Sequence, residues 1–237
     1  AARGLGDVYK RQAVTDPDHR HRGISTFIID KKTPGLTVGR DQLMMGLRGT
    51  SHVELFFDKI QLGPEHLLGE EGHGLKMALE TLGRIRLSQV CARAVGKATK
   101  IMQLSAEYAA QRSQFGKTID QFQLIQKMLA DSALEINAAR LTVLQTAWEV
   151  DQGRDVKARI SMAKVQASET LGRGADRGIQ IFGGLGYCKD LPMERYFRDA
   201  RIYRIYDGTS EIHRTVVAKA LSSGDSSLYN LPLNAIN

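Results

Sequence analysis

The first part of the chain carries apolar and β-branched residues in short runs, as β-strands do. The run Gly23–Asp30 ends at Asp30-Lys31-Lys32 and the turn signal Pro34-Gly35. A shorter run follows at Leu36–Gly39, and residues 53–58 alternate apolar with polar side chains. These strands have too few partners earlier in the chain to complete a sheet. We therefore expect the second half of an antiparallel β-domain.

Helical periodicity takes over after a glycine-rich loop that ends at Gly74. Apolar residues then recur at spacings of three and four. Long helices are predicted over 75–111, 120–150 and 155–179, and shorter ones over 193–200 and 209–221. Gly83 is expected to bend the first helix. Short connections between long helices are typical of an up-down four-helix bundle.

The predicted fold is therefore mostly α, with a C-terminal four-helix bundle preceded by a partial antiparallel β-domain. The expected divisions are an unmatched leader at 1–12, the β-domain at 13–68, the bundle at 69–221 and a flexible Ser- and Asn-rich tail at 222–237.

The second long helix carries two apolar stripes. Ile136 and Val143 belong to one, and Leu134, Leu141 and Leu144 belong to the other. A helix that is apolar over so much of its circumference is expected to pack on several sides.

The formal net charge is +7, which permits an anionic partner such as nucleic acid, a membrane surface or a phosphate-bearing ligand. The basic residues are scattered along the helices, which favours solvated helix faces over a nucleic-acid interface. No apolar run is long enough to predict a membrane span. Cys91 and Cys188 show no metal-ligand spacing, so no metal site is predicted and a reducing, intracellular compartment is the default.

Three local motifs could carry chemistry, and each also has a purely structural interpretation. Arg112–Gly116 is either a helix–helix turn capped by glycine or a phosphate grip with a stacking ring. Gln180–Gly184 is either a helix end or a close approach to a ligand. Asp207 is either a cap of the last helix or a general base. His213 on the last helix is typical of a surface or partner-facing residue.

Taken together, these motifs resemble the acyl-CoA dehydrogenase family of flavoenzymes from about Ala13 to Leu221. The segments that carry the resemblance are Gly72–Lys76, Arg112–Gly116, Phe122–Gln126, Gln180–Tyr187, Glu194-Arg195, Arg198–Ile202 and Ile205–Arg214. The family has an N-terminal helical domain, a central β-domain and a C-terminal four-helix bundle. The chain resembles the end of the second and all of the third, which implies a fragment.

The resemblance implies FAD-dependent α,β-dehydrogenation of an acyl-CoA thioester, with electrons passed on to electron-transfer flavoprotein. It also implies a homodimer or homotetramer, because FAD in the family is shared between subunits. The compartment implied is the cytoplasm, or the mitochondrial matrix in a eukaryote. A DNA-associated or a non-catalytic member of the same fold is the alternative.

The residue roles implied by the resemblance fall into three groups. Asp207 stands where the family commonly has its catalytic Glu, and its side chain is one methylene shorter. The residues similar to FAD contacts are Arg112, Phe115, Gln180, Gly183, Gly184, Thr209 and Glu211. Those similar to substrate contacts are Tyr206, Gly208, Arg84 and Arg86.

Overall fold

The computed structural model describes residues 7–19 and 22–229. The chain separates into two compact units, residues 1–82 and 83–237. We predicted the division at 68/69, and the observed one lies inside a helix. Residues 230–237 of the predicted tail and residues 1–6 of the predicted leader lie outside the described residues.

The first unit contains two antiparallel strand pairs. Strand β1 (Val8–Val14) pairs with β2 (Ile24–Asp30), and β3 (Leu36–Asp41) pairs with β4 (Val53–Phe57). Within this unit, Gly72 donates its backbone N–H to the Ser25 hydroxyl at 2.9 Å, just before the first helix begins. The predicted antiparallel β character is confirmed.

Strand β1 corrects the prediction for the leader, because residues 8–12 lie in a strand. Tyr9 pairs with Ile29 and Arg11 with Phe27. Most of β1 is exposed, and its apolar residues stand at the two ends of a polar middle, Lys10–Gln12, so the sequence shows no alternation. The backbone pairing with the β-branched β2 holds it in place, and that pairing leaves no periodic trace in the sequence of β1.

The described part of the chain after residue 73 is mostly helical. The elements are α1 (Gly74–Ile85), the π-helical η2 (Arg86–Ala92), α2 (Arg93–Gln111), the hairpin β5 (Ser113–Gln114) and β6 (Lys117–Thr118), η3 (Ile119–Gln121), α3 (Gln123–Asp151), α4 (Lys157–Phe182), α5 (Gly184–Tyr187), α6 (Met193–Arg201), η4 (Ile202–Arg204) and α7 (Ser210–Ser222). The three predicted long helices are all present.

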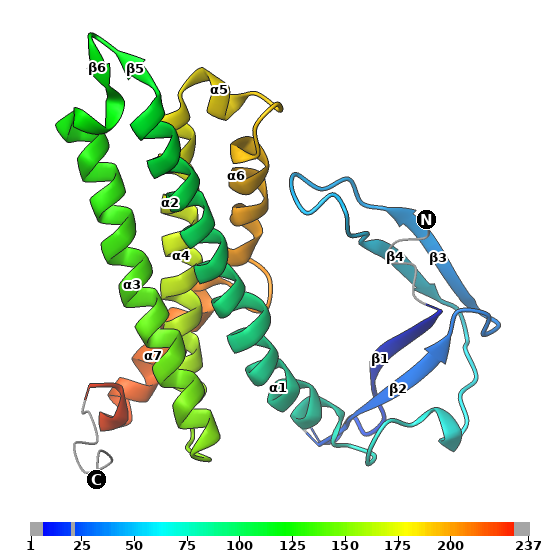
Figure 1. Ribbon diagram of the computed structural model, residues 1–237. Coiled ribbons are helices and arrows are strands. Elements are labelled where there is room, and N and C mark those ends of the chain that lie inside the picture. The colour runs from blue at the N-terminus through cyan, green and yellow to red at the C-terminus, as the bar shows by residue number, and fades with distance from the viewer. Residues whose placement is uncertain (1–6, 20–21, 230–237) are drawn as a thin grey trace. The chain divides into compact units, whose positions relative to one another are not determined.

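Helices α2, α3 and α4 pack along one another, and α6 and α7 pack on α4 (Figure 1). This confirms the predicted helical bundle. Helix α4 is central because its buried positions are mostly small, including Ala163, Ala167 and Ala175. A Cβ atom added to Gly178 would lie 2.8 Å from Ile101 Cγ2 of α2. The two helices therefore meet at van der Waals distance at this point.

Gly83 does not interrupt the helix. Helix α1 continues through Gly83, and the irregularity is the π-helical turn that begins at Arg86. A single glycine costs an α-helix only about 1 kcal/mol, so it does not by itself break one. A π-turn is rare and is often found at functional sites.

The second stripe of α3 is exposed within this chain. Ile136 and Val143 are buried as predicted, whereas Leu134 is 71% exposed and Leu141 and Leu144 are each 58% exposed. The prediction that α3 packs on several sides is wrong for the single chain. An apolar stripe predicts that a helix face will be buried, but it does not predict whether the same chain or another molecule buries it.

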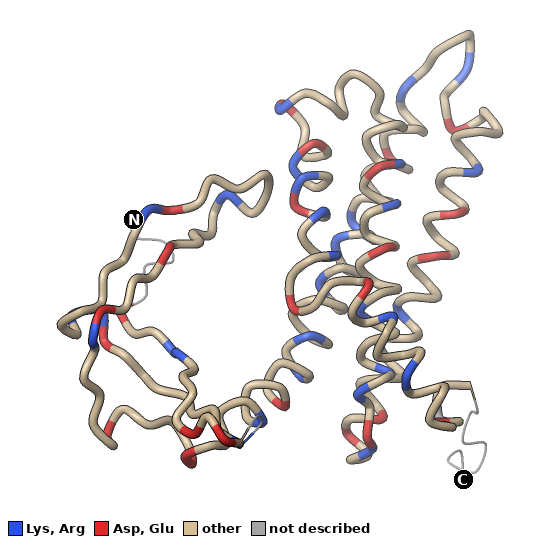
Figure 2. The backbone as a smooth tube through the Cα atoms, turned by 180° about the vertical axis from the view of Figure 1, so that it is seen from behind, with Lys and Arg blue, Asp and Glu red and all other residues tan. Residues whose placement is uncertain are grey.

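Basic and acidic residues are interleaved along the bundle helices, as Figure 2 shows for the described part of the chain. Several of them pair, as Glu135 does with Arg173 and Arg177 at 3.0 and 2.9 Å. The described helices include none that is long and apolar enough to cross a membrane.

Candidate functional site

The segment before α7 has an unusual backbone. Asp207 has a φ of +53° and Gly208 a φ of +97°. The left-handed region is tolerated by Asp and is open to Gly, and a Cβ atom on Gly208 would lie 2.8 Å from His213 Nε2. Thr209 is the N-cap of α7, and its side-chain oxygen accepts the Ile212 N–H at 3.3 Å. Asp207 therefore precedes the cap and its carboxylate does not serve as the helix cap.

The two carbonyl groups of this turn are bound by cationic or imidazole donors from distant segments. Arg86 Nε donates to the Asp207 carbonyl at 2.7 Å, and His213 Nε2 donates to the same oxygen at 3.1 Å. Lys164 Nζ donates to the Gly208 carbonyl at 2.6 Å. The π-turn, α4 and α7 thus converge on the backbone that carries the candidate base.

His213 is buried, with 4% of its surface exposed, so the surface position predicted for it is wrong. Burial is the largest cause that lowers the pKa of His213, and the hydrogen bond to the Asp207 carbonyl opposes it. Because a carbonyl can only accept, Nε2 carries the proton. In the neutral ring Nδ1 is then an acceptor, and the Ser161 hydroxyl lies 3.0 Å from it.

Lys164 is fully buried, and sequence reasoning did not single it out. Burial lowers the pKa of Lys164, while the nearby Cys91 and Asp207 act in the opposite direction. A sequence signal was present, since Lys164 stands in the apolar stripe of α4 between Ile160 and Ala167. A lysine inside a buried stripe needs a partner, and the Gly208 carbonyl provides one.

Tyr206, a predicted substrate contact, is partly buried beside Asp207. Its ring lies edge-on to Tyr203, with the ring centroids 5.3 Å apart. Burial is the largest cause that raises the pKa of Tyr206 above its ordinary value, so the phenol stays neutral at physiological pH. Of the two predicted arginines, Arg86 reaches this turn and Arg84 is exposed on α1.

A second group of predicted residues meets at the opposite end of α4. Phe115 and Gly116 form the two-residue turn between β5 and β6, with φ values of +51° and +81°. Positive φ at both positions is what a type I′ hairpin turn requires. Gly116 is therefore a hairpin residue and not the cap of α2, whose last carbonyls are followed by the extended residue Arg112.

This hairpin and the glycine loop after α4 form one pocket. Its volume is about 710 Å³, and Arg112, Phe115, Gly183 and Gly184 all line it. Phe115 is 93% exposed, and its ring lies edge-on to Phe122 at 6.3 Å. Gln180 is exposed and is not among the residues that line the pocket. Four predicted cofactor residues, far apart in the sequence, thus share one cavity.

The lining suits the adenosine diphosphate end of FAD. Arg112 supplies a guanidinium for a phosphate and Phe115 an open aromatic face for a ring. Cβ atoms added to Gly183 and Gly184 would meet no atom within 4 Å, so the space beside both glycines is free. Thr209 and Glu211 lie elsewhere, at the start of α7. The exposed Glu211 has its pKa lowered, chiefly by a backbone N–H at this helix start.

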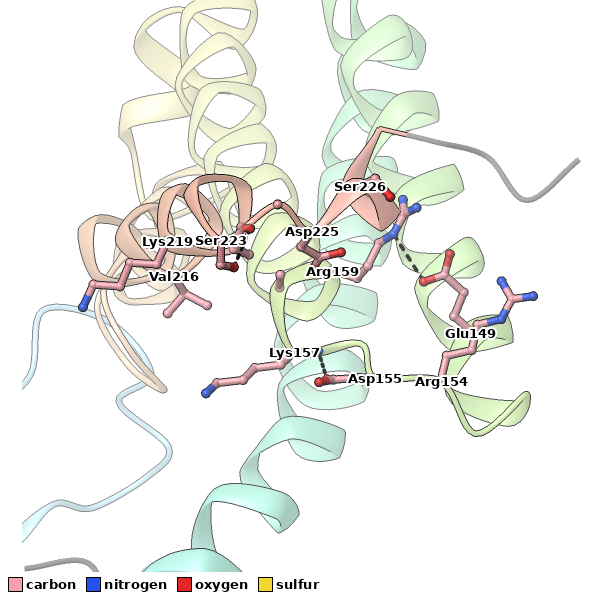
Figure 3. Close-up of a pocket in the computed structure, with 13 residues that line it drawn as sticks. Glu149, Arg154, Asp155, Lys157, Arg159, Val216, Lys219, Ser223, Asp225 and Ser226 are labelled. Atoms are coloured by element: carbon pink, nitrogen blue, oxygen red, sulfur yellow. Dashed lines mark hydrogen bonds and ion pairs between the residues drawn. The ribbon is translucent and has the colours of Figure 1, made fainter.

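A larger cavity of about 1170 Å³ lies between the end of α3, the start of α4 and the end of α7. Figure 3 shows its charged lining, with Arg159 facing Glu149 at 3.3 Å. None of the predicted site residues lines it. Among the described residues, no group of three or more His, Cys, Asp and Glu side chains is placed to hold a metal ion.

The described fold is that of a helical-bundle domain, and comparison with known proteins identifies the family. Residues 72–222 match the family model described as acyl-CoA dehydrogenase, C-terminal domain. That match covers more than half of the chain, so the chain belongs to the acyl-CoA dehydrogenase family.

Individual relatives agree with this assignment. The chain is 41% identical over 221 residues to an acyl-CoA dehydrogenase of Bacillus subtilis, covering 93% of this chain and 58% of the relative. It matches butyryl-CoA dehydrogenase from Megasphaera elsdenii with a TM-score of 0.86 and 38% identity, over 91% of this chain and 56% of that one. It also matches an FAD complex of PigA with a TM-score of 0.87 and 32% identity, over 92% and 57%. The chain thus spans somewhat more than half the length of these relatives.

Proposed function

We propose that this chain serves in the FAD-dependent α,β-dehydrogenation of an acyl-CoA thioester. The observation that carries the proposal is the shared pocket of Arg112, Phe115, Gly183 and Gly184, whose lining suits the adenosine diphosphate of FAD. Family membership gives the reaction class, and the Asp207 turn gives a carboxylate for it.

In this reaction Asp207 is the general base. Its carboxylate takes the α-proton of the thioester and becomes the neutral acid. Bound FAD would supply the acceptor for the β-hydrogen, which leaves as a hydride so that a Cα=Cβ double bond forms. Tyr206 and Gly208 flank the base on the substrate side. Arg86 Nε donates a hydrogen bond to the Asp207 carbonyl at 2.7 Å, and this bond keeps the turn fixed while the proton moves.

The cofactor would be held at two places. Arg112 would bind the pyrophosphate and Phe115 would stack on the adenine, with Gln180, Gly183 and Gly184 beside the adenosine. Thr209 and Glu211 would contact FAD at the start of α7, where the helix N-terminus favours phosphate. These residues fit a cofactor shared between two copies of the chain.

The partners proposed are a second copy of this chain and electron-transfer flavoprotein. The exposed leucines of α3, Leu134, Leu141 and Leu144, offer an apolar face for the second copy. Nothing in the charge distribution favours the DNA-associated alternative, because basic and acidic residues are interleaved along the described helices (Figure 2).

The test is anaerobic addition of a panel of acyl-CoA thioesters to the purified, flavin-loaded protein. We expect at least one thioester to bleach the flavin absorbance within seconds. A companion variant, Phe115→Ala, should lose bound flavin. Leu124→Ala, at an exposed position of α3, should retain it. Bound flavin that no thioester bleaches would contradict the proposed reaction and favour a non-catalytic member of the fold.

A further inference from the structure

A buried lysine, Lys164, donates a hydrogen bond to the turn at Asp207 and Gly208. Lys164 is 0% exposed, and its Nζ lies 2.6 Å from the Gly208 carbonyl oxygen, 44 residues away in sequence. Placing an ammonium group in a bundle core is costly unless it is hydrogen-bonded. A leucine or methionine would fill the same position in the stripe at lower cost.

The bond acts on the peptide that fixes the direction of the candidate base. The Gly208 carbonyl belongs to the peptide between Gly208 and Thr209, and Gly208 has a φ of +97°. Asp207, with a φ of +53°, directly precedes Gly208, so a bond that anchors this peptide also restrains the turn that carries the Asp207 side chain. The neighbouring Asp207 carbonyl is already bound by Arg86 and His213, so Lys164 supplies the donor for the second carbonyl.

We propose that Lys164 is a positioning residue, which holds the Gly208–Thr209 peptide so that the Asp207 carboxylate meets the α-proton of the substrate. This inference rests on the proposed function. Lys164 does not touch the substrate, and its role is exercised through the backbone. Either protonation state of the amine keeps an N–H to donate, so the bond survives the lowering of its pKa by burial.

The test is single-turnover flavin reduction by an active thioester in a stopped-flow instrument, using the flavin-loaded protein. Lys164→Met keeps the length of the side chain and removes the donor. We expect the rate constant of flavin bleaching to fall about 100-fold, as a misplacement of about 1 Å would cause. The amplitude per bound flavin should stay full. The kinetic isotope effect with an α-deuterated thioester should rise, because proton transfer becomes more rate-limiting.

Arg159→Met is the matched control, since it removes another buried cation from α4. Arg159 lies in the first turn of α4 and faces Glu149 of α3 at 3.3 Å. We expect it to lower the amount of folded protein while its rate constant stays within about threefold of wild type. Lys164→Arg, which restores a long donor, should recover part of the rate and serves if Lys164→Met does not fold.

Each outcome decides the proposal. A Lys164→Met protein with the wild-type rate constant and isotope effect overturns the positioning role and leaves the proposed function intact, and so does a Lys164→Arg protein that is no faster than Lys164→Met. A loss of amplitude at an unchanged rate constant means that Lys164 is only structural, which also overturns it. A wild-type flavin that no thioester bleaches overturns the proposed function and this inference together.

Discussion

At the scale of single residues, His213 ties α7, α4 and the Asp207 turn together. Its two ring nitrogens contact the Asp207 carbonyl and the Ser161 hydroxyl, at 3.1 and 3.0 Å. Both contacts are made by the neutral ring with the proton on Nε2. Burial disfavours protonation of His213 and lowers its pKa, and the hydrogen bond to the Asp207 carbonyl only partly opposes this.

This arrangement predicts a pH dependence of stability. The folded pKa of His213 lies below the unfolded value of about 6.5, so the unfolded chain binds more protons as the pH falls through that region. Stability contributed by the neutral ring is present at neutral pH and is lost as the pH falls from about 7.5 to 5.5. Urea unfolding of His213→Gln should show a smaller loss over this window than wild type. His52→Gln, at an exposed site, should match wild type. Equal slopes for His213→Gln and wild type would refute the assignment.

The two cysteines differ at the same scale. Cys91 is fully buried, and burial raises the pKa of its thiol to about 12, whereas Cys188 is exposed. A buried, protonated thiol is a poor nucleophile, so Cys91 behaves as a small apolar side chain of the core.

At the scale of elements, the close approach of α2 and α4 depends on Gly178. A Cβ atom there would lie 2.8 Å from Ile101 Cγ2, whereas one on Gly174 of the same helix would meet no atom within 4 Å. Gly178→Ala should lower the free energy of unfolding by about 1–3 kcal/mol through overpacking. Gly174→Ala should raise it by about 0.5–1 kcal/mol, because alanine favours the helix. Chemical denaturation of both variants checks this, and equal effects would contradict the packing described.

The elements also show what the sequence can and cannot predict. The long helices follow from apolar spacing, since that spacing is the direct cause of their packing. Strand β1 was missed because its polar middle, Lys10–Gln12, breaks any alternation of apolar and polar side chains. A bend was expected at Gly83, whereas the irregularity is the π-turn that begins at Arg86, because composition marks a weak helix position but not the hydrogen-bond shift of a π-turn.

The candidate sites likewise contain residues that the sequence predicts and residues that it does not. The resemblance singled out Arg112, Phe115, Gly183 and Gly184, and the fold gathers these four in one pocket. It did not single out Lys164, since the partner of this lysine is a backbone carbonyl, which no side-chain motif reveals. His213 was placed at the surface because one histidine on a helix carries no sign of its burial.

At the scale of the whole molecule, α3 presents an apolar stripe to solvent in the single chain. Its members Leu134, Leu141 and Leu144 are each more than half exposed. Apolar surface on this scale marks an interaction site in a soluble protein, and a second copy is the partner we propose.

The stripe predicts the response of the oligomer to substitution. Leu141→Glu together with Leu144→Glu should lower the mass of the proposed homo-oligomer to that of a smaller species, because both charges would be buried at the proposed contact without partners. Leu124→Glu changes a leucine of α3 that is more exposed, at 75%, and lies on another side of the helix, and it should leave the mass unchanged. Light scattering coupled to gel filtration measures this. A double variant with the wild-type mass would exclude this stripe as the contact.

The central claim is that Asp207 removes the α-proton of an acyl-CoA thioester, and its most direct test is the rate of anaerobic flavin bleaching in Asp207→Asn. The amide keeps the shape of the side chain and cannot accept the proton. We expect the rate constant to fall by about 10²–10⁴-fold with flavin still bound, and Asp176→Asn on α4 to match wild type. An Asp207→Asn protein that bleaches at the wild-type rate would show that another group is the base.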